Sequence, residues 1–77
     1  MATLRQLRER ALLSQTELAN MLSVSFQTIY KWEHGQARPS PANRRKLVVA
    51  LGATAEELLQ AIEETMDRKE EDDRAAA

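Results

Sequence analysis

The sequence predicts an all-α protein, a compact five-helix bundle, and three observations support this. Five serine or threonine residues stand where a helical period of apolar residues begins, and each can cap a helix N-terminus. Glycine and proline stand between the later helical stretches, where they end one helix or open the next. The chain has 77 residues and no cysteine, so we expect one domain held by a small apolar core without disulfides. The five cap residues are Thr3, Ser14, Ser25, Ser40 and Thr54.

The first helix is expected to run from Leu4 to about Leu12. Thr3 and Gln6 have the spacing of a capping box, in which two side chains satisfy amides of the first helical turn. Leu7 and Ala11 lie on the same face of this helix as its first residue, so that face is expected to be buried.

Two short helices follow, joined by a turn of about three residues. Ser14 and Glu17 form a second capping box for a helix over 15–22, and Ser25 can cap a helix from Phe26 to Glu33. The intervening residues break the apolar period. The residues expected to form the core of this segment are Leu18, Ala19, Leu22, Val24, Ile29 and Trp32.

The outward face of the helix 26–33 carries groups that can hydrogen-bond to DNA. Each residue advances about 100° around the axis, so Gln27 and Lys31 lie on the far side when Ile29 faces inward. Glutamine can pair with adenine edges, and lysine with guanine or phosphate. Two helices joined in this way suit the DNA major groove, so the segment predicts a DNA-binding helix-turn-helix.

Two further helices complete the bundle. Gly35 and Pro39 interrupt the chain after the third helix, and Pro41 opens a fourth that stops at Gly52. Thr54 begins the last helix. Its expected buried stripe is Leu58, Leu59, Ile62 and Met66. From Asp67 onward the sequence offers no apolar face and is expected to fray or to be disordered.

Net charge is uneven along the chain. The whole sequence carries −1 with a pI near 5.8, which argues against a strongly basic nucleic-acid binder. Residues 1–55 hold eight Lys or Arg and three Asp or Glu, giving +5, whereas residues 56–77 hold three and nine, giving −6. The basic part therefore coincides with the predicted DNA-binding segment, and the acidic part is a separate block.

The motif residues stand at fixed spacing. They are Ser14-Gln15, Glu17-Leu18-Ala19, Leu22, Val24-Ser25, Thr28-Ile29, Trp32-Glu33, Gly35 and Pro39. With them the chain resembles the lambda-repressor and Cro-like helix-turn-helix family, of the xenobiotic-response-element type, from about Leu4 to Ile62. The resemblance implies a bundle of the lambda-repressor type. On this basis residues 1–62 form the helix-turn-helix domain, and residues 63–77 an acidic C-terminal helix extension or frayed tail.

Two positions depart from the family pattern. The family usually has glycine just before the Ser-Gln pair and in the turn between the motif helices, where this chain has Leu12-Leu13 and Ser23. Glycine adopts a positive φ at little cost, whereas leucine or serine in that conformation costs roughly 1 kcal/mol. We expect the fold to survive with slight strain at both turns.

The resemblance assigns DNA contacts around the helix 26–33. Gln27 and Lys31 are expected to read base edges, and Gln15 to bind a phosphate. Phe26 is expected either to pack on a thymine methyl group or to pack against a neighbouring helix. Ser25 caps the helix whether or not its hydroxyl also touches DNA.

Three further residues have two alternative roles each, and two more have an orienting role. Thr28 is expected to bind a phosphate or to space the helices, and Tyr30 to bind a phosphate or to cover the edge of the core. Arg38 is expected to contact a phosphate, the alternative being a solvated loop arginine. Arg8 and Glu33 are expected to form an ion pair that orients the recognition helix without binding DNA itself.

The predicted function is sequence-specific binding of double-stranded DNA by a transcriptional regulator, with repression as the expected sign. Two copies would read half-sites about 34 Å apart, which predicts a homodimer on DNA. The stripe of Leu59, Ile62 and Met66 is a candidate dimer surface, although the same stripe could be core. The alternative function is an antitoxin or adaptor module that binds a protein partner through the C-terminal segment.

Other function classes find little support in the sequence. His34 is the single histidine, the carboxylates are adjacent in sequence, and no glycine-rich phosphate loop is present. We therefore expect no catalytic residue, metal site or cofactor. The longest hydrophobic run, Leu47 to Leu51, is far shorter than the roughly 20 residues that span a bilayer. With no signal-peptide pattern at the start, we expect a cytoplasmic protein of prokaryotic or phage-like type that is associated with DNA.

Overall fold

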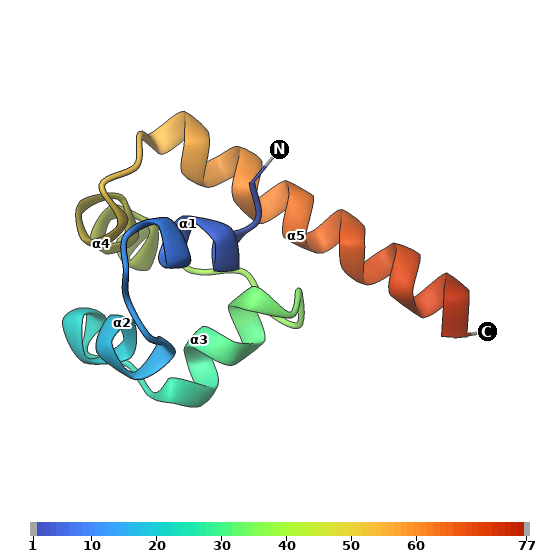
Figure 1. Cartoon of the computed structure of the whole chain (residues 1–77), viewed down its shortest axis with the longest axis horizontal. Coiled ribbons are helices and arrows are strands. Elements are labelled where there is room, and N and C mark those ends of the chain that lie inside the picture. The colour runs from blue at the N-terminus through green and yellow to red at the C-terminus, as the bar shows by residue number, and fades with distance from the viewer. Residues whose placement is uncertain (1, 77) are drawn as a thin grey trace.

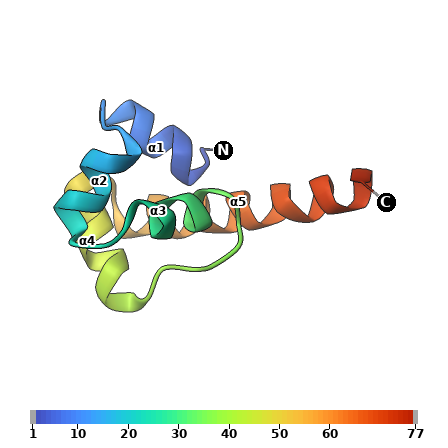
Figure 2. The ribbon, with the colours of Figure 1, turned by 90° about the horizontal axis from the view of Figure 1, so that it is seen from below.

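Five helices make up the part of the protein that the structure describes. The computed structural model describes residues 2–76 and the side chains of residues 2–69, and no strand occurs among them. The helices are α1 (Leu4–Arg10), α2 (Gln15–Leu22), α3 (Phe26–Glu33), α4 (Pro41–Leu51) and α5 (Ala55–Ala76). The predicted all-α five-helix bundle is thus confirmed. Figures 1 and 2 show α5 running past the other four helices and projecting beyond them.

The helices begin at the expected cap residues. The side chains of Thr3, Ser14, Ser25 and Ser40 each accept a hydrogen bond from a backbone amide of the following first turn. Thr54 and Glu57 also exchange the two hydrogen bonds of a capping box, at 3.0 and 3.1 Å. Local hydrogen bonds within three residues therefore set the N-termini, which explains why sequence alone located them.

Two helix ends differ from expectation. α1 ends at Arg10 and not near Leu12, because the chain turns into the left-handed region at Leu12. α5 continues as helix to Ala76, whereas the sequence predicted fraying from Asp67. The segment is rich in good helix formers, and Arg68 pairs with Glu64 one turn earlier at 3.2 Å, so local interactions favour the helix without an apolar face. The division of the chain at residue 62 stays a prediction.

The core is a single apolar cluster to which all five helices contribute. Five of the six expected core residues of the motif are buried in it, and the sixth, Val24, is partly buried and packs against it. The buried apolar residues are Leu4, Leu7, Leu18, Ala19, Leu22, Ile29, Trp32, Leu47, Leu51, Ala53, Leu58, Ala61 and Ile62.

The expected buried stripe of α5 was wrong at one position. Leu59 is 51% exposed, whereas Ala61 and Ile62 are buried with Leu58. The stripe therefore follows the i, i+3, i+4 spacing from Leu58 and leaves Leu59 on its outer edge. Because Ile62 is in the core and Met66 packs against it, the three-residue stripe proposed as a dimer surface is not available as such.

A buried threonine joins α5 to the start of α1. The backbone N–H of Leu4 donates to Oγ1 of Thr65 at 3.1 Å, and that hydroxyl donates to the carbonyl oxygen of Ala61 at 2.8 Å. The first amides of a helix have no hydrogen-bond partner within the helix. Thr65 therefore supplies the partner of a buried amide that would otherwise have none. This contact fixes the middle of α5 against α1.

Gly35 brings the turn after α3 close to α5. Its φ is +69°, and a Cβ placed on it would lie 2.9 Å from Cβ of Lys69 and 3.3 Å from the carbonyl oxygen of Thr65. A side chain at this position would therefore clash with α5 as well as strain the backbone. The C-terminal end of α3 is held beside the second half of α5 for this reason.

Both turns that lack the family glycine have the strained conformation expected of them. Leu12 has a φ of 61° and Ser23 a φ of 58°. Leu12 is 89% exposed, so its side chain gains almost no burial to offset the backbone cost.

Replacing Leu12 by glycine is expected to stabilise the fold by about 1 kcal/mol, because glycine removes the left-handed strain and almost no buried surface is lost. The midpoint of thermal unfolding should then rise by about 4–8 °C. Gly52→Ala is the matched control: Gly52 has a φ of +62° and open space around it, so alanine should destabilise by a similar amount. A Leu12→Gly variant that melts at or below the wild-type temperature would contradict the strain assigned to this turn.

Candidate nucleic-acid interface

The turn between α2 and α3 fixes the start of α3. The N–H of Val24 donates to the carbonyl oxygen of Ala19 at 3.0 Å, and Ser25 Oγ accepts from the N–H of Thr28 at 3.2 Å. The hydroxyl groups of Ser25 and Thr28 also lie 2.9 Å apart. This pair places two hydroxyl groups at the N-terminus of α3, an end that favours an anion.

One face of α3 is buried and the opposite face is exposed. Ile29 and Trp32 lie in the core, whereas Gln27 and Lys31 are exposed. Phe26 is 46% exposed, so only part of its ring packs against the protein. The structure thus presents on one surface the side chains that the sequence placed there, and their contacts with DNA stay a prediction.

An almost dry ion pair joins α3 to α1. Arg8 Nε lies 2.6 Å from Glu33 Oε2 and Arg8 Nη2 3.2 Å from Oε1, with the two side chains only 12% and 4% exposed. Arg8 Nη1 also donates to the carbonyl oxygen of Leu13 at 2.8 Å. The hydrogen bonds to Glu33 raise the pKa of Arg8 despite the opposing effect of burial. The structure contains the expected ion pair.

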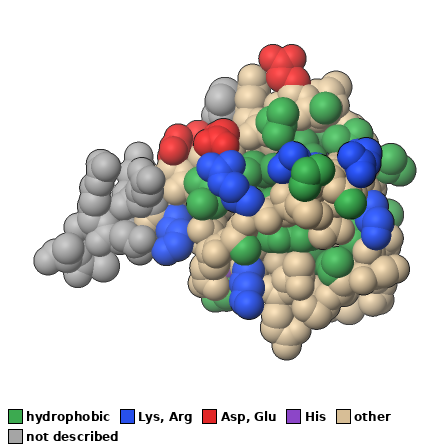
Figure 3. All heavy atoms as spheres, turned by 180° about the vertical axis from the view of Figure 1, so that it is seen from behind, with side chains coloured by type: hydrophobic (Ala, Val, Ile, Leu, Met, Phe, Trp, Pro, Cys, Tyr) green, Lys and Arg blue, Asp and Glu red, His purple; other side chains and the backbone are tan. Residues whose placement is uncertain are grey.

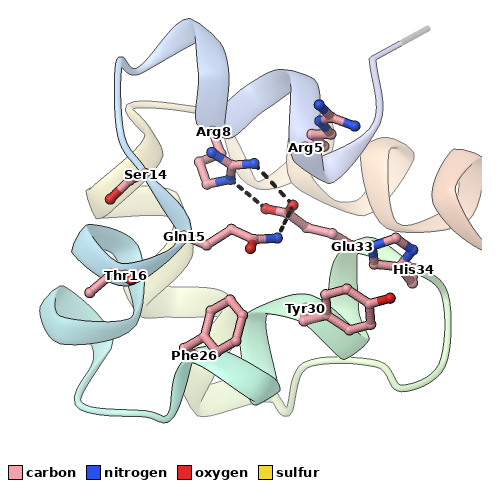
Figure 4. A pocket seen from close by; sticks show the side chains of 9 residues that line it. All are labelled: Arg5, Arg8, Ser14, Gln15, Thr16, Phe26, Tyr30, Glu33 and His34. Carbon is pink, nitrogen blue, oxygen red and sulfur yellow. Dashed lines mark hydrogen bonds and ion pairs between the residues drawn. The ribbon is translucent and has the colours of Figure 1, made fainter.

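Gln15 makes a contact that sequence reasoning missed. Its Nε2 donates to Oε1 of Glu33 at 3.0 Å, so this side chain at the start of α2 shares the carboxylate with Arg8 (Figure 4). The three side chains come from α1, α2 and α3. Together they set the position of α3 relative to the N-terminus of α2.

Arg38 is not an isolated loop arginine. Its Nη1 donates to Oε1 of Glu63 at 2.6 Å and its Nη2 to Oε2 at 3.4 Å, which links the loop to α5. This ion pair lowers the pKa of Glu63 and raises that of Arg38. Both side chains are more than half exposed, so the pair contributes little stability.

Two of the other basic residues bond the backbone. Lys46 Nζ donates to the carbonyl oxygen of Leu22 at the end of α2, at 3.3 Å, and Arg44 Nη1 donates to that of Pro39 at 3.2 Å. A lysine at a helix C-terminus satisfies an unpaired carbonyl group. Lys46 thus ties α4 to the end of α2, and Arg44 ties α4 to the loop that precedes it.

An open cleft of about 530 Å³ runs beside the exposed face of α3 (Figure 4). Tyr30 and His34 form part of its wall and stack, with ring centroids 3.9 Å apart and planes inclined by 26°. Their spacing of four residues on adjoining helical turns was a signal that could have predicted this contact. The cleft is lined by Arg5, Arg8, Ser14, Gln15, Thr16, Phe26, Tyr30, Glu33 and His34.

Neither a metal site nor a membrane span is found in the described part of the chain. No three of its His, Cys, Asp and Glu side chains are grouped so that they could hold a metal ion. None of its helices is both long and apolar enough to cross a bilayer.

Replacing Glu33 by alanine is expected to destabilise the fold by about 3 kcal/mol, because Arg8 would remain buried without its partner. Chemical unfolding followed by Trp32 fluorescence measures this change. Glu56→Ala, which removes an exposed acidic residue, is the control and should have almost no effect. The double variant Arg8→Met/Glu33→Leu removes both charges and should recover most of the loss. A Glu33→Ala variant as stable as the control would contradict the role of the ion pair.

Comparison with known proteins identifies one match. The model of the helix-turn-helix family that includes the lambda-repressor and Cro-like domains matches residues 4–58, which is most of the chain. No curated protein and no solved structure matches the sequence significantly. The matched region contains α1 to α4 and the first turn of α5, and it ends before the acidic part of that helix.

Proposed function

The chain belongs to the lambda-repressor and Cro-like helix-turn-helix family, a family of DNA-binding regulators, and we propose that it binds double-stranded DNA sequence-specifically as a transcriptional repressor. One observation carries this proposal: Gln27 and Lys31 are exposed on a helix whose other face is locked into the core. A helix held so rigidly can present these two side chains to base edges in the major groove. The protein would act in the cytoplasm, as a regulator of prokaryotic or phage-like type associated with DNA.

Other side chains around α3 support the same placement of DNA. Phe26 exposes part of its ring next to Gln27, which suits packing on a thymine methyl group. The hydroxyl groups of Ser25 and Thr28 lie at the N-terminus of α3, and the exposed Tyr30 carries a hydroxyl group that can reach a phosphate.

Gln15 and Arg38 can bind phosphates despite their contacts within the protein. An amide nitrogen carries two N–H donors, so Gln15 can bond Glu33 with one and a phosphate with the other. The Arg38–Glu63 pair is exposed and weak, and a DNA phosphate can therefore replace Glu63.

We further propose a homodimer through a groove between α4 and α5. The groove has a volume of about 210 Å³ and a mostly apolar lining, and Val49 and Leu59 are exposed large hydrophobic side chains of the same two helices. Figure 3 shows hydrophobic side chains lying among Lys and Arg on the face seen from behind. The proposed occupant is the same surface of a second copy, since one domain makes few base contacts and two-fold symmetry provides two half-sites. The groove is lined by Pro41, Arg44, Arg45, Val48, Ala55, Leu58 and Leu59.

Alanine at Gln27 or Lys31 is expected to weaken binding to the preferred duplex by about 1–3 kcal/mol each, or roughly 5–150-fold, while leaving stability unchanged. The preferred site is first selected from random duplexes at a stated salt concentration, and affinities are then measured by fluorescence anisotropy. Gln60→Ala, an exposed glutamine on α5, is the matched control and should bind like wild type.

Two results would contradict the DNA-reading role. One is a wild-type protein without preference among duplexes at low salt. The other is a Gln27→Ala/Lys31→Ala variant that keeps the full biological activity of the protein, together with a variant lacking residues 63–77 that loses it. An antitoxin or adaptor that binds a protein partner through its C-terminal segment would show this pattern.

Replacing Leu59 by glutamate is expected to abolish the dimer, because a charge at a two-fold apolar contact is repeated on both copies. Analytical ultracentrifugation should then find a folded monomer, and binding to a palindromic site should lose cooperativity. Leu12→Glu places the same charge on another exposed leucine and should leave assembly unchanged. If Leu59→Glu assembles like wild type, the α4–α5 groove is not the interface.

A further inference from the structure

The cleft beside α3 continues onto α5. A second open cleft, of about 330 Å³, shares three residues with the first: Arg5, Glu33 and His34. Joined at these residues, the two form one trough, here called the α3 trough, which runs from the N-terminus of α2 past Tyr30 to the second half of α5. The second cleft is lined by Thr3, Arg5, Glu33, His34, Gln36, Thr65, Arg68 and Lys69.

Most of the charged side chains that line the α3 trough are cationic. The side chain of Glu33 is only 4% exposed, and its carboxylate is neutralised by Arg8 and accepts a hydrogen bond from Gln15. The other charged side chains that line the second cleft are Arg5, Arg68 and Lys69, which are all cationic. The acidic C-terminal block therefore turns a basic edge toward α3, although its overall charge is negative.

The two arginines can bind an anion without leaving their present partners. Arg5 Nε lies 3.2 Å from Glu9 Oε1, and Arg68 Nε lies 3.2 Å from Glu64 Oε1. Both pairs use Nε alone among the five N–H groups of the guanidinium, so the terminal nitrogens can donate to a further oxygen. Exposed pairs of this kind are also weak enough to exchange for a phosphate.

The trough lies beside the helix that is proposed above to enter the major groove. It follows α3, whose eight residues extend over about 12 Å. Successive phosphates of one strand are farther apart along the winding strand than their rise of about 3.4 Å along the DNA axis, so about two phosphates would pass along α3. Gln15, at the start of the trough, is the residue proposed above to bind the first of these.

We propose that the α3 trough holds the sugar–phosphate backbone of the strand that borders the groove occupied by α3, with Arg5 and Arg68 as the added phosphate contacts and Lys69 beside them. The proposal rests on the DNA binding proposed above and extends it beyond the region that matches the family, which ends at residue 58. Contacts from α5 are thus an addition made by this chain's own C-terminal helix. They enlarge the protected DNA site beyond the base pairs that α3 reads.

The salt dependence of binding tests this proposal. Affinity for the selected duplex is measured over a range of salt concentrations for the wild type and for Arg5→Ala, Arg68→Ala and the double variant. Each lost phosphate contact should reduce the slope of log K against log salt by about 0.9, so the double variant should lose nearly two units of slope. Sequence preference should not change, because neither residue is placed at a base edge.

Two controls separate a local contact from general electrostatics. Arg10→Ala removes the same charge from α1, at a residue that pairs with Glu57 and does not line the trough, and its slope should stay close to that of the wild type. Arg5→Lys/Arg68→Lys keeps the charges and should restore most of the slope. Thermal unfolding verifies that each variant is folded, as expected for exposed positions.

The outcomes distinguish the two proposals. If the wild type selects a site but the Arg5→Ala/Arg68→Ala variant keeps the slope of Arg10→Ala, the α3 trough does not carry the strand and the proposed function still holds. If the wild type shows no preference among duplexes, both the proposed function and the trough proposal fail. A loss of slope in the double variant, with selectivity intact, supports the trough alone.

Discussion

The ion pair between Arg8 and Glu33 is the contact on which the geometry of the proposed DNA-binding surface depends. It closes two hydrogen bonds at 2.6 and 3.2 Å in a nearly dry setting and recruits the amide of Gln15 to the same carboxylate. Replacing such a pair by apolar side chains often costs no stability, so its value lies in orientation. It determines where α3 lies relative to the N-terminus of α2, and hence how the residues proposed to bind phosphate and base edges are placed relative to one another.

The C-terminal helix is part of this arrangement. Thr65 accepts a hydrogen bond from the first amide of α1. Gly35 has no side chain, so the turn after α3 can approach α5 more closely than any other residue would allow. Both contacts involve the stretch from Thr65 to Lys69, so this part of α5 is held close to the start of α1 and to the turn after α3. An acidic segment that composition alone assigns to solvation thus brings Arg68 into a trough beside α3.

The acidic and basic parts of the chain are paired with each other in the folded protein. Glu63 pairs with Arg38 and Glu57 with Arg10, so carboxylates of α5 hold two exposed arginines of the basic half by weak ion pairs. A polyanion can displace such carboxylates. The protein can therefore be acidic overall and still present cationic groups to DNA.

The sequence by itself determined the helix starts, the identity of the motif, the left-handed turns at Leu12 and Ser23 and the inward face of α3. These features depend on hydrogen bonds and backbone conformations that span only a few residues, or on a helical period that any window of the chain displays. Only the tertiary structure decided that Glu63 pairs with Arg38 and that Gln15 bonds Glu33. It also decided that Ile62 is buried while Leu59 is exposed, and that Thr65 bonds the start of α1. Each of these contacts joins residues that are distant in the chain or depends on where a neighbouring helix covers a face, and the relative placement of helices is fixed only when the whole core packs.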